Sequence, residues 1–311
     1  MDQITTLPPD KVRVSASTGF TTVTVTGADR REFLQGQLTQ DLDRASAEHS
    51  PLTGWASAKG RLLATGPVIS WQDGIHLVLP AAIAGTIANR LRMFVLRAAA
   101  EISIDRYALL GLTARDGTAV NVANGSLGDA FGATADYTDY CIARHNADRS
   151  RAWLIAPARS IDGLGDIRHV TIDDRADQWT LADVRAGYPV IQPSTSEAFV
   201  PQMVNLDLLD AISFTKGCYV GQEIVARTQN LGRIKRRMYR FSTMVDDIPE
   251  PGQLLHTESG ATGKVVCGAS NGERAELLAV VPIADIAKAW FADKSGKQEL
   301  RLETLPYEIP A

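Results

Sequence analysis

Lys216-Gly217-Cys218-Tyr219-Val220-Gly221-Gln222-Glu223 is the stretch of this chain that is most informative about its fold and its site. It places a thiol close to a cation, between two glycines and ahead of an amide and a carboxylate. Glycines weaken a helix, and Lys, Gln and Glu resist full burial, so packing alone does not explain the mixture. A nearby cation favours the thiolate, which is the reactive form. The alternative is a buried structural cysteine at a junction between a loop and a helix.

Cys218 and Lys216 are therefore the candidate catalytic residues. If a helix begins at Val220, Cys218 lies near its N-terminus, where unpaired N–H groups favour a thiolate. Lys216 and Arg227 add positive potential, and Glu223 opposes it unless it pairs with one of them. We hypothesise that Cys218 is a partly exposed thiol of lowered pKa, used for redox or transfer chemistry.

Further motifs occur on both sides of this octapeptide. They are Phe33–Asp41, Ala58–Arg61, Phe199–Asp207, Ile212–Phe214 and Arg233–Arg237. Together these stretches resemble the YgfZ family of folate-binding proteins, which is similar to the aminomethyltransferase (T-protein) of the glycine cleavage system. The resemblance runs from about Gly19 to Arg240, and it is specific because several separate motifs occur in the family's order. The residues after Arg240 carry no motif of comparable strength.

The resemblance implies an α+β fold of the aminomethyltransferase type, with ferredoxin-like split α+β layers around a central channel and a C-terminal antiparallel β-barrel. We expect a folate-binding α+β region over residues 1–110, a second α+β region with the Lys216–Glu223 loop over 111–236, and the barrel over 237–311. The order of the elements expected from periodicity also favours a split α+β layer over a doubly wound parallel sheet.

Hydrophobic periodicity and turn residues predict the individual elements. In the first half we expect strands over 21–26, 61–71, 75–79 and 101–113, a helix from the N-cap Asp29 through Phe33 and Leu38, and a helix from Pro80 to about Arg97. Strands over 140–144 and 153–156 and a helix over 177–186, closed by Gly187, follow. Short strands over 238–244, 252–256, 263–267 and 275–281 are typical of a small barrel, with a helix over 283–291 and a closing strand over 299–305.

Composition is that of an ordinary globular protein of 311 residues, long enough for two or three domains, with a formal net charge of −4. That charge argues against binding to RNA, DNA or an anionic membrane through bulk electrostatics. No apolar run approaches the roughly 20 residues that span a bilayer, and the N-terminus is typical of neither a secretory signal nor a transit peptide. We therefore predict a cytoplasmic protein with no membrane contact.

The three cysteines, Cys141, Cys218 and Cys267, are far apart and odd in number, which argues against a disulfide framework and fits a reducing compartment. An iron–sulfur cluster normally needs four thiolates, so one chain cannot supply a conventional cysteine-only site. Zinc-ligand spacings, a Walker loop and a Gly-x-Gly-x-x-Gly motif are also missing, and we predict no resident metal. Any link to iron–sulfur clusters is then indirect, transient or shared between chains.

The catalytic carboxylate of the T-protein has no counterpart in this sequence. The resemblance aligns Ala64 and Thr65 with the positions where the T-protein carries two aspartates. A methylene transfer without that carboxylate loses its main stabilising charge, on the order of 10²- to 10⁴-fold in rate. The sequence therefore argues against glycine-cleavage activity, and the fold alone does not make the protein an enzyme.

Tetrahydrofolate, or a folate derivative, is the cofactor that the resemblance implies. A pterin ring is held by stacking and by a carboxylate that accepts two N–H bonds. Phe20 and Trp179 stand where the family often carries aromatics, although Trp179 can equally be a core residue of a helix. Arg185 replaces the family's usual glutamate, and Glu197 or Glu223 is left to bind the pterin edge. With the folate channel beside Cys218, the remaining candidate cofactor-binding residues are Tyr219, Gln222 and Arg227, together with Glu223.

A run of basic residues with no acid among them lies between positions 227 and 240, after the Lys216–Glu223 loop. Its members are Arg227, Arg233, Lys235, Arg236, Arg237 and Arg240. The functional interpretation is contact with phosphates of tRNA, through Arg233, Lys235, Arg236 and Arg237, or with the tail of a folylpolyglutamate. The alternative is a solvated linker that leads into the barrel.

The resemblance implies a folate-binding accessory protein that supports the assembly or repair of iron–sulfur enzymes, including radical enzymes that thiolate tRNA. Two alternatives stay open. One is a tetrahydrofolate-dependent aminomethyl- or methyltransferase, against which Ala64 and Thr65 count. The other is a tRNA-binding module with a vestigial folate pocket, suggested by Arg185 together with the basic run.

Overall fold

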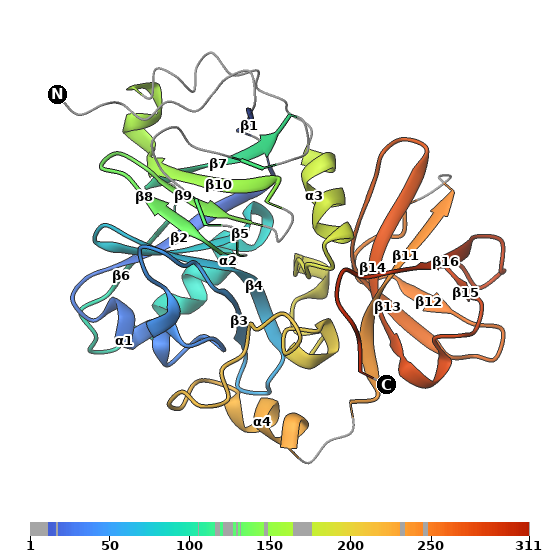
Figure 1. Ribbon diagram of the computed structural model, residues 1–311. Helices are drawn as coiled ribbons and strands as arrows, with labels where there is room; N and C mark the ends of the chain where they lie inside the picture. The colour runs from blue at the N-terminus through green and yellow to red at the C-terminus, as the bar shows by residue number, and fades with distance from the viewer. Residues whose placement is uncertain are drawn as a thin grey trace. The chain divides into compact units, whose positions relative to one another are not determined.

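A computed structural model of the chain describes residues 12–16, 18–104, 106–115, 119–120, 127–128, 130, 132–145, 149–163, 176–230, 234–244 and 248–310. The chain falls into two compact units, each built from three segments (Figure 1). The first unit is Met1–Gln35, Asp41–Leu52 and Gly66–Ala176, and the second is Gly36–Gln40, Thr53–Thr65 and Asp177–Ala311. The three domain boundaries expected from the sequence stay a prediction.

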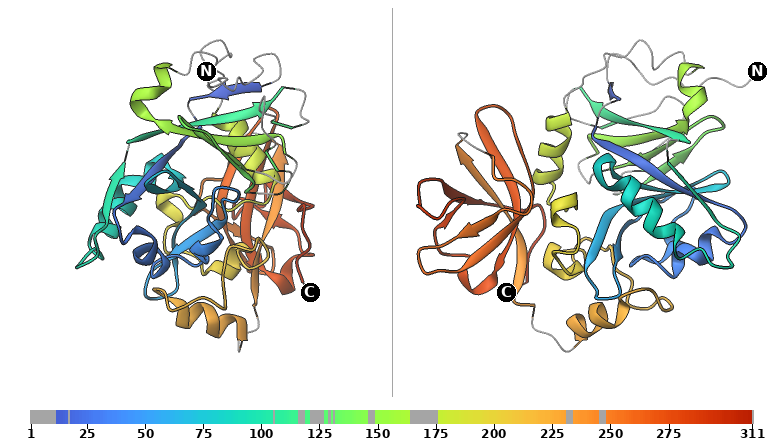
Figure 2. Two further views of the ribbon diagram at one scale, coloured as in Figure 1. Left: turned by 60° about the vertical axis from the view of Figure 1, so that its left-hand side comes forward. Right: turned by 180° about the vertical axis from the view of Figure 1, so that it is seen from behind.

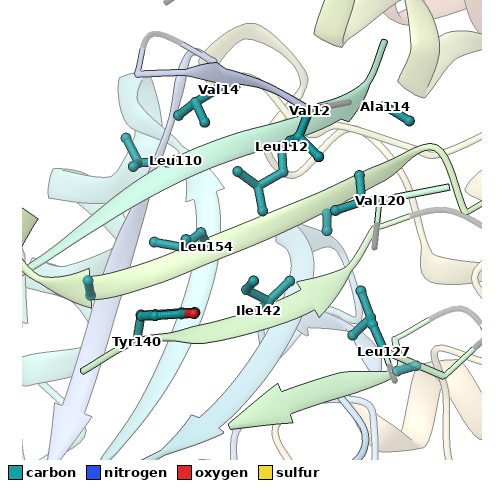
Figure 3. Close-up of a cluster of buried hydrophobic side chains, with 13 residues drawn as sticks. Val12, Val14, Leu110, Leu112, Ala114, Val120, Leu127, Tyr140, Ile142 and Leu154 are labelled. Carbon is teal, nitrogen blue, oxygen red and sulfur yellow. The ribbon is translucent and has the colours of Figure 1, made fainter. Parts of the chain in front are cut away.

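The first unit contains an antiparallel sheet of order β1-β7-β10-β9-β8. Its strands are β1 (Val12–Ser15), β7 (Tyr107–Ala114), β8 (Thr134–Asp136), β9 (Cys141–Arg144) and β10 (Arg151–Pro157), and a 3₁₀ turn, η2 (Ala158–Gly163), follows. Alternate residues of neighbouring strands share one face, since Val14 pairs with Leu112, and Leu154 pairs with both Leu110 and Ile142. These side chains form the buried core of the sheet (Figure 3).

A second sheet has the order β3-β4-β5-β2-β6, with strands β2 (Phe20–Thr26), β3 (Leu52–Ala56), β4 (Leu62–Trp71), β5 (Gly74–Pro80) and β6 (Glu101–Ile104). The strands β4 and β5 form a hairpin in which Trp71 pairs with Gly74. Helix α2 (Ala81–Arg92) contacts β2, β5 and β6 and lies across them in the right-hand view of Figure 2. Its buried residues follow helical spacing: Ile83, Ala84, Ile87, Ala88 and Leu91.

The second unit combines short helices with a closed antiparallel barrel of order β11-β14-β13-β12-β15-β16 (Figure 1). The helical elements are η3 (Pro193–Thr195), η4 (Pro201–Val204), α3 (Ala176–Arg185) and α4 (Gln222–Asn230). The barrel strands are β11 (Arg236–Met244), β12 (Leu254–His256), β13 (Thr262–Ser270), β14 (Arg274–Pro282), β15 (Trp290–Phe291) and β16 (Glu299–Glu303). Phe241, Leu277 and Trp290 fill its interior.

The expected fold class, α+β with a C-terminal antiparallel barrel, is confirmed, and most expected strands lie within a few residues of their observed bounds. The end of α3 is also as expected. Gly187 has φ +68, its N–H donates to the Val184 carbonyl, and the Tyr188 N–H donates to the Asp183 carbonyl. This pair of bonds is the Schellman motif that glycine favours.

Four expected elements are wrong in extent or type. The single strand expected over 101–113 is two strands, because β6 pairs with β2 in one sheet and β7 pairs with β1 and β10 in the other. The helix expected over 283–291 is only the 3₁₀ turn η5 (Ile283–Asp285), because Trp290 is buried and pairs with Leu300 in the barrel.

The other two corrections concern helix ends. Helix α1 (Arg30–Gln35) stops at Gln35 rather than reaching Leu38, whose backbone bridges to Trp55. Helix α2 stops at Arg92 rather than Arg97. Asp29 precedes α1 as expected, but its carboxylate accepts a hydrogen bond from the Ala99 N–H. Among the described residues, no helix has both the length and the apolar character that crossing a membrane requires.

Burial of His76 predicts that acid destabilises the first unit. Its Nδ1 lies 3.0 Å from Thr24 Oγ1 and its Nε2 lies 3.3 Å from the Trp71 carbonyl oxygen. Burial lowers the pKa of His76 to about 4, against the smaller raising effects of the Trp71 carbonyl and Asp73, while the charge of Arg106 adds a smaller lowering effect. Between about pH 6.5 and pH 4, His76 therefore binds a proton in the unfolded chain but not in the folded chain. The free energy of unfolding falls as the pH falls through that window, by up to roughly 3 kcal/mol.

We expect His76→Gln, which keeps a donor and an acceptor, to remove most of that pH dependence. Urea denaturation at about pH 7 and about pH 4.5 measures it as the change in the free energy of unfolding. The matched control is His256→Gln, at a partly exposed histidine in the barrel. Equal acid sensitivity of the wild type and His76→Gln contradicts the prediction.

Candidate functional site

The Lys216–Glu223 loop lies against the segment Gly36–Gln40, about 180 residues earlier in the chain and in the same unit. The ammonium of Lys216, a buried side chain, donates to the carbonyl oxygens of Leu38 at 3.0 Å and Gln40 at 2.9 Å. It also stands 5.3 Å from the centre of the Tyr219 ring, a cation–π contact. One side chain therefore joins two of the motifs that the sequence singled out.

Backbone hydrogen bonds run along the same junction on either side of Lys216. The Ser213 N–H donates to the Thr39 carbonyl at 2.9 Å, and the Val220 N–H donates to the Gly36 carbonyl at 3.1 Å. Thr39 is itself fixed, since its hydroxyl donates to the Ala211 carbonyl at 2.7 Å. The loop is therefore held at both ends.

The turn at Lys59-Gly60-Arg61 packs on the end of this loop. Gly221 has φ +81, and a Cβ there would lie 2.4 Å from the Ser57 carbonyl oxygen. Gly60 has φ +66, and a Cβ there would lie 2.6 Å from Cβ of Ile224, on α4. Both positions require glycine, because the backbone conformation and the space exclude a side chain. Three motifs that are far apart in sequence thus meet around Tyr219–Gly221.

Cys218 is exposed, whereas the other two thiols are buried. Burial raises the pKa of Cys141, and the nearby carboxylate of Asp136 raises it further. Burial also raises the pKa of Cys267, to about 12. The expected helix at Val220 begins two residues later, at Gln222, so Cys218 precedes α4 by four positions. The electrostatic effect of a helix end falls off within one turn, and that part of the hypothesis is weakened.

Lys216 is not an exposed amine beside the thiol. Its ammonium is committed to two backbone carbonyls and an aromatic ring, so it positions the loop that carries Cys218. Tyr219 is buried, and burial raises its pKa to about 12. Gln222 turns its side chain back, and its Oε1 accepts from the Tyr219 N–H at 3.3 Å. Tyr219 and Gln222 therefore contribute to loop structure, and their role in cofactor binding stays a prediction.

Thr65, which the sequence resemblance aligns with an aspartate of the T-protein, makes structural contacts in this fold. Thr65 is buried, its hydroxyl donates to the Pro189 carbonyl at 2.6 Å, and the Ile191 N–H donates to that hydroxyl at 3.4 Å. Its neighbour Ala64 is buried as well. The hydroxyl of Thr65 thus fixes the chain that follows α3 and offers no carboxylate for acid–base work.

The two candidate stacking residues belong to different units. Phe20, in the first unit, lies 5.3 Å from the Trp153 ring centre. Trp179, in the second unit, is 4% exposed on α3. One turn further along that helix lies Asp183, a fully buried carboxylate that our sequence analysis missed. An acid four residues after an apolar aromatic, on a helix with a buried face, is the signal that could have found it.

The carboxylates proposed for the pterin edge, Glu197 and Glu223, are both exposed, as is Arg227 on α4. Arg185 reaches a different partner. Its Nε and Nη2 donate to Glu276 Oε1, on β14, at 2.9 and 2.7 Å. The positive charge that replaces the family's usual glutamate is therefore neutralised by an acid from the barrel.

Three arginines of the basic run make contacts within the protein. Arg237 is 4% exposed and forms a two-pronged ion pair with Asp207, at 2.6 and 2.8 Å. The prediction that Arg237 contacts tRNA is therefore wrong, because its guanidinium is buried and neutralised. Arg240 lies 3.6 Å from Glu276, and Arg236 donates to the Thr262 carbonyl at 3.0 Å.

Lys235 and Arg233 are the other two residues of the basic run that were proposed to contact tRNA. Lys235 is exposed, and Arg233 lies outside the described residues. The described ranges contain no group of three or more His, Cys, Asp or Glu side chains arranged to hold a metal ion.

Comparison with known proteins supports both resemblances. The chain is 29% identical to the tRNA-modifying protein YgfZ of Serratia proteamaculans, over 92% of this chain and 90% of that protein. It is 27% identical to the tRNA-modifying protein YgfZ of Cronobacter sakazakii, over 98% of each. The resemblance to YgfZ is confirmed. No family model matches the chain.

Among solved structures, the glycine cleavage system aminomethyltransferase T of Bartonella henselae superposes with a TM-score of 0.66. The match covers 95% of this chain and 86% of that chain, at 16% identity. The fold is that of the T-protein. At this identity the likeness concerns the backbone architecture alone.

The two glycines of the loop provide a matched test of its packing. We expect Gly221→Ala to destabilise the protein by about 1–3 kcal/mol, because the new Cβ meets a backbone oxygen at a strained φ. Gly217→Ala serves as the control, because a Cβ there meets nothing within 4 Å, and we expect a change within about 0.5 kcal/mol. Urea denaturation measures both, and equal effects contradict this account of the loop.

Thiol exposure gives a second prediction. We expect one equivalent of an alkylating reagent to label the native protein at Cys218 and three to label the denatured protein, because Cys141 and Cys267 are buried. Peptide mapping by mass spectrometry assigns the labelled residue. Labelling of Cys141 or Cys267 in the native protein at a rate close to that of Cys218 contradicts the structure.

Proposed function

We propose that this protein is a folate-binding accessory factor that supports the assembly or repair of iron–sulfur enzymes, including radical enzymes that thiolate tRNA. The observation that carries the proposal is the junction at Lys216. An exposed thiol stands in a loop that is built from three separate motifs and held at both ends, on a T-protein-like fold. The sequence resemblance aligns the structural Thr65 with an aspartate of the T-protein. The names of the relatives, which describe tRNA-modifying proteins, are consistent with the proposal.

We propose that a folate ligand binds at Trp179. A pterin needs an aromatic face and a carboxylate that accepts two N–H bonds. Trp179 and the fully buried Asp183 stand one turn apart on α3 and supply both groups. We therefore propose Asp183 as the carboxylate for the pterin edge, in place of the exposed Glu197 or Glu223. The Arg185–Glu276 ion pair supports this assignment, because it draws the guanidinium to the barrel. When bound, tetrahydrofolate supplies a carrier for one-carbon units.

An aminomethyl- or methyltransferase is less well supported. Such an enzyme needs a carboxylate that stabilises the charge developing on the transferred carbon. Thr65 donates to a backbone carbonyl, and Ala64 has no polar group. An assay for one-carbon transfer from a tetrahydrofolate derivative separates the two functions, and turnover sustained by the purified protein would favour the transferase.

Direct binding of tRNA is also less well supported, since Arg237 is buried in an ion pair with Asp207. We therefore propose that the protein affects tRNA through the enzymes that modify it. Three free cysteines and the absence of a disulfide among the described residues favour a reducing compartment, and we propose the cytoplasm.

Calorimetric titration with tetrahydrofolate tests the folate proposal. We expect saturable binding by the wild type, and binding weakened by about tenfold in Trp179→Phe, because the smaller ring stacks less well on a pterin. The matched control is Trp290→Phe, which changes an equally buried tryptophan in the barrel and should bind like the wild type.

A further variant addresses the carboxylate. Asp183→Asn keeps the size of the side chain and removes the charge that pairs with the pterin N–H groups, so we expect binding to weaken by at least tenfold. Adenosine is the small-ligand control. Absence of tetrahydrofolate binding by the wild type would refute the folate part of the proposal.

A further inference from the structure

Three large apolar side chains stand exposed together just after α2, in the first unit. Met93 is 68% exposed, Phe94 41% and Leu96 87%. They fall within four consecutive positions, whereas the other large exposed apolar residues of the described chain are spread over residues 214–302: Phe214, Met244, Ile248, Leu254 and Leu302. A concentrated exposed apolar patch on a protein usually marks an interaction site.

The segment that carries these side chains is held firmly where it leaves α2. The Phe94 N–H donates to the Leu91 carbonyl at 2.9 Å. The guanidinium of Arg92 donates to the Ile102 carbonyl at 2.9 Å and to Asn89 Oδ1 at 2.6 Å. These bonds tie the start of the segment to both α2 and β6.

The other end of the segment is fixed by the turn before α1. The Ala99 N–H donates to the Asp29 carboxylate at 2.7 Å, and the Asp29 N–H donates to the Ala99 carbonyl at 3.1 Å. Gly27 allows this approach, because a Cβ there would lie 2.1 Å from the Ala99 carbonyl oxygen. The exposed apolar residues thus sit on a rigid support, and a partner would bind without a large cost of ordering them.

Arginines flank the apolar residues in the sequence, while the nearest acids, Asp29 and Glu101, lie at the far end of the segment. Residues 81–100 include Arg90, Arg92 and Arg97 and no acid, in a chain whose net charge is −4. The guanidinium of Arg92 donates to oxygens that carry no charge, those of the Ile102 carbonyl and the Asn89 amide. Arg97 is exposed. An apolar centre of Met and Phe with arginine at its rim is the composition that protein interfaces favour.

We propose that Met93, Phe94 and Leu96 form a docking surface for a partner protein that presents an apolar stripe edged by Asp or Glu. The carboxylates of the partner pair with Arg92 and Arg97, while its apolar side chains cover Met93 and Leu96. An amphipathic helix with acidic flanks has this pattern. The proposal uses none of the residues assigned to folate and is independent of the proposed function.

Charge and chemistry argue against other occupants of this docking surface. A second copy of the chain would set like-charged arginine rims against each other. An anionic membrane surface is usually recognised by clusters of about four to eight basic residues, more than this segment carries. Single-stranded RNA is gripped through stacking on flat rings, and the two most exposed side chains here, Met93 and Leu96, are aliphatic.

A photo-crosslinking amino acid, benzoylphenylalanine, placed at Leu96 of the full chain tests the proposal in the cells that make the protein. The matched control carries the same probe at Met244, which is 75% exposed on the barrel strand β11. We expect a cross-linked protein from the Leu96 position that the Met244 position does not give. Mass spectrometry should locate the cross-link on the partner within a surface that is apolar and acidic.

Charge reversal provides the second arm. Arg97→Glu in the Leu96 probe variant should lower the yield of the adduct by about fivefold, because one rim charge now repels the partner. Any of four results overturns the proposal: no adduct, an adduct with a second copy of the chain, an adduct that ribonuclease or lipid extraction removes, or a yield unchanged by Arg97→Glu. Because Leu96 and Arg97 are exposed, thermal melting of each variant should match the wild type.

Discussion

The buried ammonium of Lys216 is the constraint on which the rest of the candidate site depends. A charged group removed from water is costly unless it is neutralised or fully hydrogen-bonded. Two backbone carbonyls, from Leu38 and Gln40, and the face of Tyr219 meet this need. The geometry holds only while residues 36–40 and 213–220 stay side by side, so the ammonium fixes the loop and, through it, the exposed thiol of Cys218. Each bond from a charged donor is worth about 1.5–3 kcal/mol.

Glycine and threonine extend that constraint to the neighbouring segments. Gly221 lets the loop pass within van der Waals distance of the Ser57 carbonyl, and Gly60 makes room for Ile224 at the start of α4. Thr65 then ties β4 to the chain after α3. The Thr65 hydroxyl serves architecture, because both of its hydrogen bonds are to the backbone of residues 189–191. A shared fold does not fix the chemistry, so the function of this chain depends on its own thiol loop and on α3.

Ion pairs between residues far apart in the chain explain why the roles expected for Arg237 and Arg185 from the sequence differ from their contacts in the structure. Arg237 seemed available for phosphate because no acid lies near it in the run, yet Asp207 meets it with both oxygens. Arg185 seemed to block a pterin, yet Glu276 neutralises it from the barrel. Neither partner could be found from spacing, because 30 and 91 residues separate the members of each pair. Asp183 was overlooked for a related reason, since an acid on a helix is expected to face water.

The amino-acid sequence was enough to predict the fold class, most of the strands and the site motifs, because period-two alternation, Pro-Gly and Asn-Gly turns and the spaced motifs are local properties of the chain. It also predicted that Gly187 closes α3, because glycine is favoured in the left-handed backbone conformation that this position requires. Tertiary structure decided the rest. Residues 101–113 form two strands that belong to different sheets. Residues 283–291 do not form the expected helix, because Trp290 is buried inside the barrel. The burial of Lys216 and its bonds to Leu38 and Gln40 were also decided at this level, because those partners lie about 180 residues earlier in the chain.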